Sequence, residues 1–175
     1  MNTPTSDTAA ALRFGCGDTT LGTVLAAESD RGVAAIFLGD DRAKLRRDLA
    51  AAFPGAALID DAGALSETIA KVVTLINAPQ LGTTLPLDLR GSALELAVWE
   101  ALRSIPPGGT RTYGALAKAL PMPATAQEVG AACAANRLAV AVPCHRVVKA
   151  DGSISGYRWG VQRKRRLVNM EGVTR

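Results

Sequence analysis

Cysteine and histidine are scarce in this chain of 175 residues. The three cysteines are Cys16, Cys133 and Cys144, and His145 is the single histidine. An odd number of widely spaced cysteines does not make a disulfide framework. The same spacing lacks the clustered ligands of a zinc site. We therefore expect free thiols, no metal centre and no cofactor.

Long apolar runs are missing as well. No window approaches the roughly 18 uninterrupted apolar residues of a membrane-spanning helix. The first ten residues have neither the basic start nor the apolar core of a signal peptide. We therefore expect a cytoplasmic protein without membrane attachment, whose cysteines stay reduced. Residues 1–11 are predicted to form a disordered tail.

Negative charge is scarce in the second half of the chain. Residues 91–175 contain twelve Lys and Arg against five Asp and Glu, whereas residues 1–90 contain eight against eleven. A basic half of this kind is typical of a protein that binds a polyanion, and nucleic acid is the usual one. An ordinary solvated basic face gives the same count. Charge alone therefore leaves both interpretations open.

The first half of the chain has the pattern of a small α/β domain. Three short apolar segments separated by turn residues predict strands. Two later segments have apolar residues at helical spacing, and Asp41 stands where it would cap the first helix. Alternating leucines between residues 85 and 89 predict a further short strand. The three strands are expected at residues 14–16, 21–27 and 33–38, and the helices at 41–52 and 63–77.

A break at Arg90 and Gly91 divides the chain into two expected domains, residues 12–89 and 90–175. The second domain begins with a helix that starts at Ser92 and carries one apolar stripe. Trp99 lies beside that stripe, and we expect it in the core rather than in a binding site. The stripe consists of Leu94, Val98 and Leu102.

Two short helices, predicted over residues 112–120 and 126–135, are joined by a tight turn. Such a pair is typical of a helix-turn-helix, whose second helix docks on DNA. Thr125 and Glu128 have the spacing of a capping box, which fixes the start of the second helix. Small residues on that helix favour close approach to a DNA groove or, equally, to a neighbouring helix. They are Gly130, Ala131, Ala132, Ala134 and Ala135.

Cys144 is followed directly by His145, which places a thiol beside a base. Free cysteine has a pKa of about 8.5, so it needs a base or a positive field to react as thiolate. A buried, inert cysteine is the commoner meaning of an isolated Cys-His pair. Here an apolar run precedes the pair and the most basic stretch of the chain follows it, which favours a stabilised thiolate.

Short motifs around this pair resemble those of the O6-alkylguanine-DNA alkyltransferases, and in particular the C-terminal half of the bacterial Ada proteins. The similarity begins near residue 12 and reaches the end of the chain. The most specific motif contains the cysteine itself. The motifs are Val142-Pro143-Cys144-His145-Arg146-Val147, Ala132-Cys133-Ala134-Ala135-Asn136, Ser155-Gly156-Tyr157-Arg158-Trp159-Gly160, Tyr113-Gly114 and Met170-Glu171-Gly172.

The resemblance implies a ribonuclease-H-like α/β domain followed by a mainly helical domain with a winged-helix-like helix-turn-helix. It implies direct repair of O6-methylguanine, or of O4-methylthymine, in double-stranded DNA by a monomer. The lesion is flipped out of the duplex, as any protein must do to reach an atom within the base stack. The methyl group then passes irreversibly to Cys144, so each molecule reacts once.

The resemblance also implies roles for five residues. Cys144 attacks the methyl carbon, His145 takes the thiol proton through a water, and Glu171 orients His145. Tyr113 helps rotate the lesion phosphate and donates a proton to the departing guanine. Asn136 holds the turns around the site together.

Further residues are assigned by the same resemblance to the base pocket and the DNA surface. Trp159 would add bulk to the pocket and disfavour large O6 substituents. The pocket residues are Val147, Val148, Tyr157 and Trp159, and the DNA-binding residues are Tyr113, Ala126, Gln127, Gly130 and Ala131.

The sequence departs from the family pattern in the second helix of the pair. The arginine that family members insert into the duplex is Gln127 here, and Glu128 adds a negative charge beside it. Fewer phosphate contacts predict weaker DNA affinity. Two alternatives therefore stand beside repair: a non-catalytic sensor of alkylation damage, and an acceptor of alkyl groups from a non-DNA donor. The zinc domain of Ada has no counterpart in this sequence, so we expect no regulation by methyl transfer to it.

Overall fold

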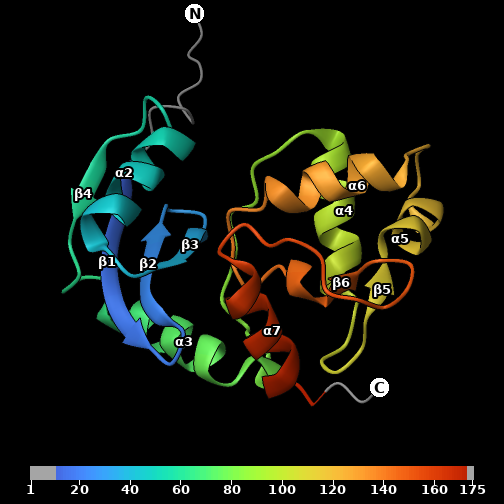
Figure 1. Ribbon diagram of the computed structural model, residues 1–175. Coiled ribbons are helices and arrows are strands. Elements are labelled where there is room, and N and C mark those ends of the chain that lie inside the picture. The colour runs from blue at the N-terminus through green and yellow to red at the C-terminus, as the bar shows by residue number, and fades with distance from the viewer. Residues whose placement is uncertain (1–10, 173–175) are drawn as a thin grey trace, which may run out of the picture.

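The computed structural model describes residues 11–172. The predicted tail therefore lies outside the described residues, apart from Ala11. A small sheet flanked by helices forms the N-terminal part, and a mainly helical part packs beside it (Figure 1). This mixed α/β architecture confirms the expected fold class. Among the described residues, no helix is long and apolar enough to cross a membrane.

The N-terminal sheet has the strand order β3-β2-β1-β4. The first three strands are antiparallel neighbours, and β4 runs parallel to β1. The three predicted strands are confirmed: β1 extends beyond the predicted residues at both ends, β2 is shifted by one residue and β3 ends one residue later. The short β4 was not predicted. The strands are β1 (Leu12–Thr19), β2 (Gly22–Glu28), β3 (Val33–Gly39) and β4 (Leu58–Asp60).

Two helices cover the sheet, and both were predicted. Helix α2 (Arg42–Ala52) packs on β2 and β3, and its N-cap is Asp41, whose carboxylate accepts from the Ala43 amide at 2.9 Å. Helix α3 (Ser66–Asn77) packs on β1 and β2. A Cβ added at Gly15 would lie only 2.8 Å from an Ala62 Cα, so the backbones approach as closely as they do because this residue is glycine.

The C-terminal part is built from four helices. Helix α4 begins at Ser92 with a complete capping box to Glu95, and Trp99 on it is buried, as expected. The predicted helix pair is confirmed as α5 and α6, and the Thr125–Glu128 capping box is present. The elements are α4 (Ala93–Arg103), β5 (Arg111–Thr112), α5 (Tyr113–Ala119), α6 (Ala126–Ala134), the 3-10 turn η2 (Cys144–Arg146), β6 (Val147–Val148) and α7 (Val161–Met170).

The strand predicted between residues 85 and 89 is wrong: only Leu87 forms a bridge, with Val33. The Val33 amide donates to the Pro86 carbonyl at 2.9 Å, and the Asp88 amide donates to the Val33 carbonyl at 2.8 Å. Pro86 has no N–H and so breaks any longer ladder. The segment therefore touches the edge of the sheet at one point and then leaves it.

The same edge strand joins the two parts of the molecule. The Ile36 amide in β3 donates to the Arg137 carbonyl at 2.9 Å, and the Ala139 amide donates to the Ile36 carbonyl at 3.0 Å. The exposed backbone groups of an edge strand are thus used to hold the chain just before Cys144. The N-terminal sheet consequently fixes a segment of the C-terminal part.

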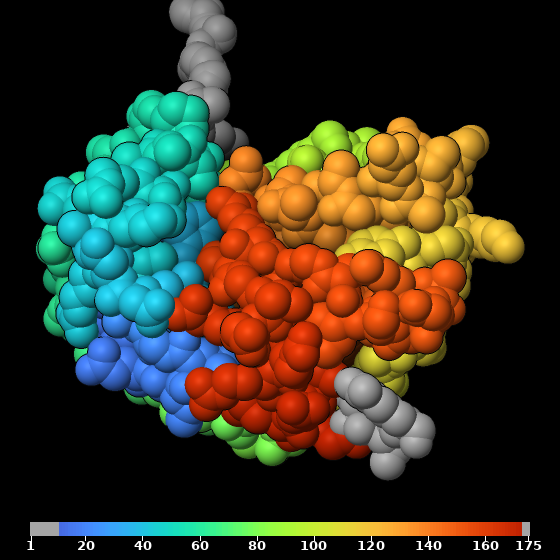
Figure 2. Space-filling view, in the orientation of Figure 1, coloured from blue at the N-terminus to red at the C-terminus, as the bar shows by residue number. Residues whose placement is uncertain are grey.

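Side chains reinforce this junction. Arg163 in α7 donates to the Leu21 carbonyl at 2.7 Å and to Asp40 at 2.9 Å. Figure 2 shows the segment leading into α7 wedged between the sheet and the remaining helices. The Arg158 guanidinium lies 5.1 Å from the centre of the Phe37 ring, a cation–π distance.

We expect Phe37→Ala to lower the free energy of unfolding by about 3–5 kcal/mol, because it leaves a cavity beneath Arg158 and Trp159. Phe37 is 1% exposed, and its ring centre lies 6.4 Å from that of Trp159. Denaturant unfolding measures the change. Leu81→Ala is the control, since Leu81 is 71% exposed and its loss should cost less than about 0.5 kcal/mol. Equal effects of the two substitutions would contradict this account of the junction.

Candidate active site

Cys144 opens the turn η2 directly after Pro143 and is only 4% exposed. It borders a cavity of about 360 Å³ at the boundary between α5, α6 and the loop before α7. The lining is mainly apolar and includes two phenols. The lining residues are Tyr113, Gly130, Cys133, Ala134, Cys144, Gly156, Tyr157 and Arg158.

The buried amide of Asn136 holds the backbone around the thiol. Its Oδ1 accepts from the Leu138 amide at 2.9 Å. Its Nδ2 donates to the Val142 carbonyl at 3.0 Å and lies 3.4 Å from Cys144 Sγ. One side chain therefore ties together both ends of the turn between residues 138 and 142 and reaches the nucleophile.

That turn contains a strained residue. Val140 has φ of 69°, and among the described residues it is the only non-glycine with positive φ. A β-branched side chain in this region costs on the order of 1–3 kcal/mol. The strain persists because Asn136 on one side and β3 on the other determine the path of the chain.

Burial raises the pKa of the Cys144 thiol, and this effect outweighs the hydrogen bond from Asn136 and the positive charges of Lys164 and Arg158, which act the other way. The stabilised thiolate expected from the basic sequence is therefore not the resting form. The apolar walls of the cavity exclude the water that would solvate the charge. A base must remove the proton before the sulfur can attack.

His145 is fully buried and is the nearest titratable base along the chain. Burial lowers its pKa, although contact with Glu171 acts in the opposite direction, so the imidazole is neutral and able to accept a proton. Its Nε2 lies 3.0 Å from Glu171 Oε2, but neither ring nitrogen makes a hydrogen bond of normal geometry. Glu171 thus lies where the sequence motif implied.

Sequence reasoning missed the role of Arg146, although it lies in the same motif. The buried Arg146 guanidinium donates to Glu171 Oε1 at 3.0 Å and also contacts Oε2, and it donates to the Ile105 carbonyl at 2.6 Å. Burial alone would raise the pKa of Glu171, but contacts with His145 and Arg146 lower it to about 2. Glu171 is therefore a permanent negative charge beside the imidazole.

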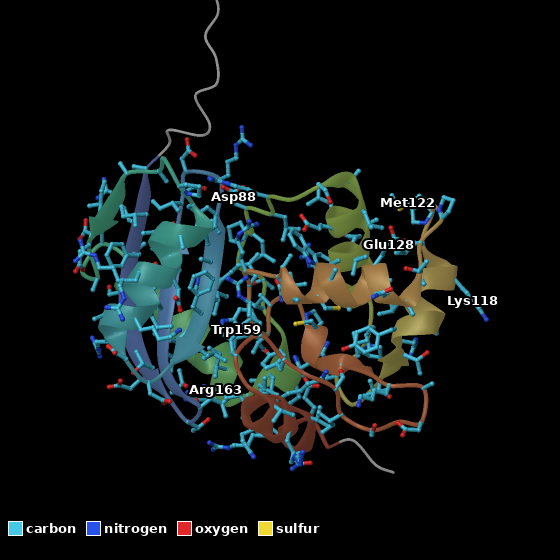
Figure 3. All side chains as sticks on the ribbon, turned by 45° about the horizontal axis from the view of Figure 1, so that its top comes forward. Asp88, Lys118, Met122, Glu128, Trp159 and Arg163 are labelled. Carbon is cyan, nitrogen blue, oxygen red and sulfur yellow. The ribbon has the colours of Figure 1, made fainter. Side chains whose placement is uncertain are left out.

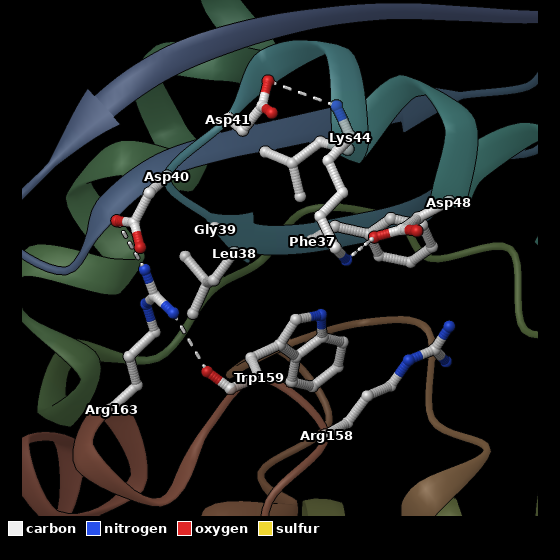
Figure 4. A pocket seen from close by; sticks show the side chains of 11 residues that line it. Phe37, Leu38, Gly39, Asp40, Asp41, Lys44, Asp48, Arg158, Trp159 and Arg163 are labelled. Carbon is white, nitrogen blue, oxygen red and sulfur yellow. Dashed lines mark hydrogen bonds and ion pairs between the residues drawn. The ribbon is translucent and has the colours of Figure 1, made fainter.

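The predicted base-pocket residues fall in different places. Tyr157 lines the cavity, and its buried hydroxyl has no hydrogen-bond partner among the described residues. Val147 and Val148 are buried in β6. Trp159 packs edge-on against Tyr157, with ring centres 5.3 Å apart, but lines a second cavity with Phe37 and Arg163 between the two parts of the molecule (Figure 4).

Four of the five predicted DNA-binding residues lie on α6, and the fifth, Tyr113, begins α5. Ala126, Gln127 and Ala131 are exposed on this helix, whereas Gly130 lies over the Tyr113 ring and lines the cavity. Figure 3 places Glu128 near Lys118 and Met122, on the side of the molecule away from the sheet. The exposed face of α6 and the cavity that holds Cys144 are therefore adjacent.

Several basic residues of the C-terminal half have structural partners. Arg137 donates to the Arg90 carbonyl at 2.9 Å, Arg158 donates to the Asn136 carbonyl at 2.6 Å, and Lys164 is buried. The basic character of the C-terminal half is thus partly internal. The exposed cations of this half include Arg111, Lys149, Arg165 and Arg166.

The pKa of Glu171 predicts an acid-sensitive interaction. Because its folded value of about 2 lies below the ordinary 4.5, its contacts stabilise the fold fully above pH 4.5 and are lost as pH falls toward 2. We expect Glu171→Gln to flatten the plot of Tm against pH in this window. Glu100→Gln, an exposed carboxylate on α4, should leave the slope unchanged. If Glu171→Gln left the slope unaltered, the lowered pKa of Glu171 in the folded protein would be refuted.

Comparison with known proteins agrees with this geometry. Residues 93–173 match the family model described as 6-O-methylguanine DNA methyltransferase, DNA binding domain. The chain is 47% identical over 164 residues to the Escherichia coli bifunctional transcriptional activator and DNA repair enzyme Ada, covering 92% of this chain. It covers 46% of Ada, so it spans less than half the length of that relative.

Two further relatives come from mycobacteria. The methylated-DNA–protein-cysteine methyltransferase of Mycobacterium bovis is 40% identical over 111 residues, which are 63% of this chain and 67% of that protein. The crystal structure of Mycobacterium tuberculosis OGT in complex with DNA has a TM-score of 0.71 at 29% identity, covering 91% of this chain and 92% of that one. The chain therefore belongs to the O6-methylguanine-DNA methyltransferase family.

Proposed function

We propose that this protein repairs O6-methylguanine in double-stranded DNA by moving the methyl group irreversibly to its own Cys144. The observation that carries the proposal is a buried thiol at the wall of a cavity of about 360 Å³, beside a buried neutral imidazole. A cavity of this size accommodates a single flipped base. The protein would act once per molecule, because a thioether offers no easy route back to a thiol.

The chemistry needs a base, an orienting acid and a binding surface. His145 takes the thiol proton, and the anionic Glu171 stabilises the imidazolium that results. The sulfur forms a bond to the methyl carbon while the bond from that carbon to O6 breaks. Tyr113 lines the cavity from the start of α5 and donates its hydroxyl proton to the departing guanine.

The DNA surface is proposed to be the exposed face of α6, with the N-terminus of α5 beside it. This geometry supports the second helix of a helix-turn-helix entering a groove, and the capping box gives that helix a rigid start. The Mycobacterium tuberculosis relative was crystallised with DNA. The same proposal includes a monomeric protein that acts in the cytoplasm. It also includes individual roles in DNA binding for four residues of α6, which are Ala126, Gln127, Gly130 and Ala131.

The domain boundary at residue 90 also stays a prediction. It fits the junction, where Asp88 still bonds to β3 and α4 begins at Ala93. The two alternative functions, a lesion sensor and an acceptor from non-DNA donors, are separated from repair by the experiments below.

We expect incubation with a duplex containing O6-methylguanine to add one CH2 to the protein, mapped by mass spectrometry to Cys144. Cys144→Ser should gain nothing yet still bind the lesion, because it keeps the cavity nearly unchanged. Cys133→Ser is the matched control, a second buried cysteine in the same cavity, and should react normally. Binding of the lesion by wild type without any mass gain would indicate a sensor instead.

We expect Gln127→Arg to accelerate transfer from duplex DNA by on the order of tenfold, since one charge-assisted contact contributes about 1.5 kcal/mol or more. The rate with free O6-methylguanine should not change, because the free base does not need to be flipped. Gln162→Arg adds the same charge on the exposed surface of α7 and serves as control. Acceleration by both substitutions alike would reveal a general charge effect, and an unchanged duplex rate would show that Gln127 does not stand in for the arginine.

A further inference from the structure

A chain of three side chains runs from a buried cation to the cavity. Lys164 Nζ donates to Ser155 Oγ at 2.8 Å, and Ser155 Oγ lies 2.5 Å from the Tyr113 hydroxyl. Lys164 comes from α7, Ser155 from the loop before it, and Tyr113 from the first turn of α5. The Ser155 hydroxyl is thus in hydrogen-bond contact with both Lys164 and Tyr113.

The chemistry of the groups fixes the direction of the Lys164–Ser155 hydrogen bond and allows Ser155 to donate in the other. An ammonium only donates, so Ser155 Oγ must accept from Lys164. The single proton of Ser155 is then free for the Tyr113 oxygen, which is the only other hydrogen-bond partner of that hydroxyl within residues 11–172. With its oxygen accepting from Ser155, the phenol is left to donate its own proton into the cavity.

Lys164 is an unusual residue for such a position. It is 1% exposed, and the only other hydrogen bond that its ammonium makes within residues 11–172 is to the Gly156 carbonyl at 3.3 Å. No carboxylate pairs with it among the described residues, whereas the thiols of Cys144 and Cys133 face its charge. Burial lowers the pKa of Lys164, with the two thiols acting the other way. The Lys164 ammonium is therefore a stronger acid than an exposed lysine ammonium.

Resting on the proposed function, we infer that Ser155 and Lys164 form a proton relay that resupplies Tyr113 as it protonates the departing guanine. The step balances. As the S–C bond forms and the C–O6 bond breaks, the guanine takes the electron pair and receives the Tyr113 proton. Tyr113 takes the Ser155 proton, and Ser155 takes one from Lys164, which becomes a neutral amine and is later reprotonated by solvent.

The charges in the cavity also balance. Once His145 has taken the thiol proton, its imidazolium is paired with Glu171 and the charge of the Cys144 thiolate is offset by the Lys164 ammonium. After transfer, the sulfur is a neutral thioether, the lysine a neutral amine and the guanine a neutral base. No uncompensated charge is left in an apolar site, where it would be costly. Ser155 and Lys164 act through Tyr113 and are positioning residues rather than groups that touch the base.

Ser155 provides a sharper test than Lys164, because the lysine charge also acts on the Cys144 thiol. Ser155→Val removes the hydroxyl, and Ser155→Thr keeps it in a side chain of nearly the same shape. Ser153→Val is the control in the same loop, because Ser153 is exposed and its hydroxyl bonds only to Asp151 in the described structure. Unfolding temperatures of all three establish that the fold is intact.

Two methyl donors separate proton delivery from nucleophile activation. One is a duplex with O6-methylguanine, whose leaving group needs a proton. The other is methyl iodide, whose leaving iodide needs none. The single-turnover rate of methylation at Cys144, followed by mass spectrometry, is measured for each donor with the full-length chain.

We expect Ser155→Val to slow transfer from the duplex at least about tenfold, in the lower range for loss of general acid catalysis. Ser155→Thr should restore the rate, and methyl iodide should methylate all variants equally. In a Tyr113→Phe background, Ser155→Val should have no further effect, because the relay acts only through the phenol.

Other outcomes overturn the relay. Equal slowing with both donors would mean that Ser155 shapes the cavity or supports the thiolate. A Ser155→Val protein as fast as wild type would exclude Ser155 from proton delivery. Wild-type protein that takes methyl from methyl iodide but none from the duplex would overturn the proposed function itself, and the relay with it.

Discussion

The Asn136 amide is the interaction on which the site depends. It is buried, and it joins Leu138, Val142 and the sulfur of Cys144 in one set of hydrogen bonds. Its loss would leave several backbone groups without partners in the core, each costing about 1–3 kcal/mol. The pairing of Ile36 with Leu138 anchors the same turn to the N-terminal sheet. The nucleophile is therefore positioned by both parts of the molecule.

Buried charge is arranged in two separate groups around Cys144. On one side, Glu171 is held anionic by Arg146 and lies against the neutral His145. On the other, Lys164 leads through Ser155 to Tyr113. The first group suits removal of a proton from the thiol, and the second suits delivery of a proton to the leaving base. Separate routes allow acid and base chemistry in one small cavity, as the proposed reaction requires.

The local pattern of the sequence predicted most of the fold. Alternation and helical periodicity located β1, β2, β3, α2 and α3, and cap residues located the start of α6. The misses have physical reasons. Strand β4 has three residues, too few for a pattern, and α7 carries a basic run that hides its apolar face. The predicted strand near Leu87 failed because Pro86 lacks a donor for pairing with β3.

By itself, the sequence determined most of the elements, the motif that contains Cys144 and His145, and the residues assigned to the site by resemblance. Only the tertiary structure decided that burial holds the resting thiol protonated, since exposure is a property of packing. It also decided which basic residues face solvent and which, like Arg146 and Lys164, lie inside. Partners such as Arg146 and Glu171 are 25 positions apart, and Tyr113 and Ser155 are 42 apart. Contacts over such separations depend on how the elements pack, which no local pattern records.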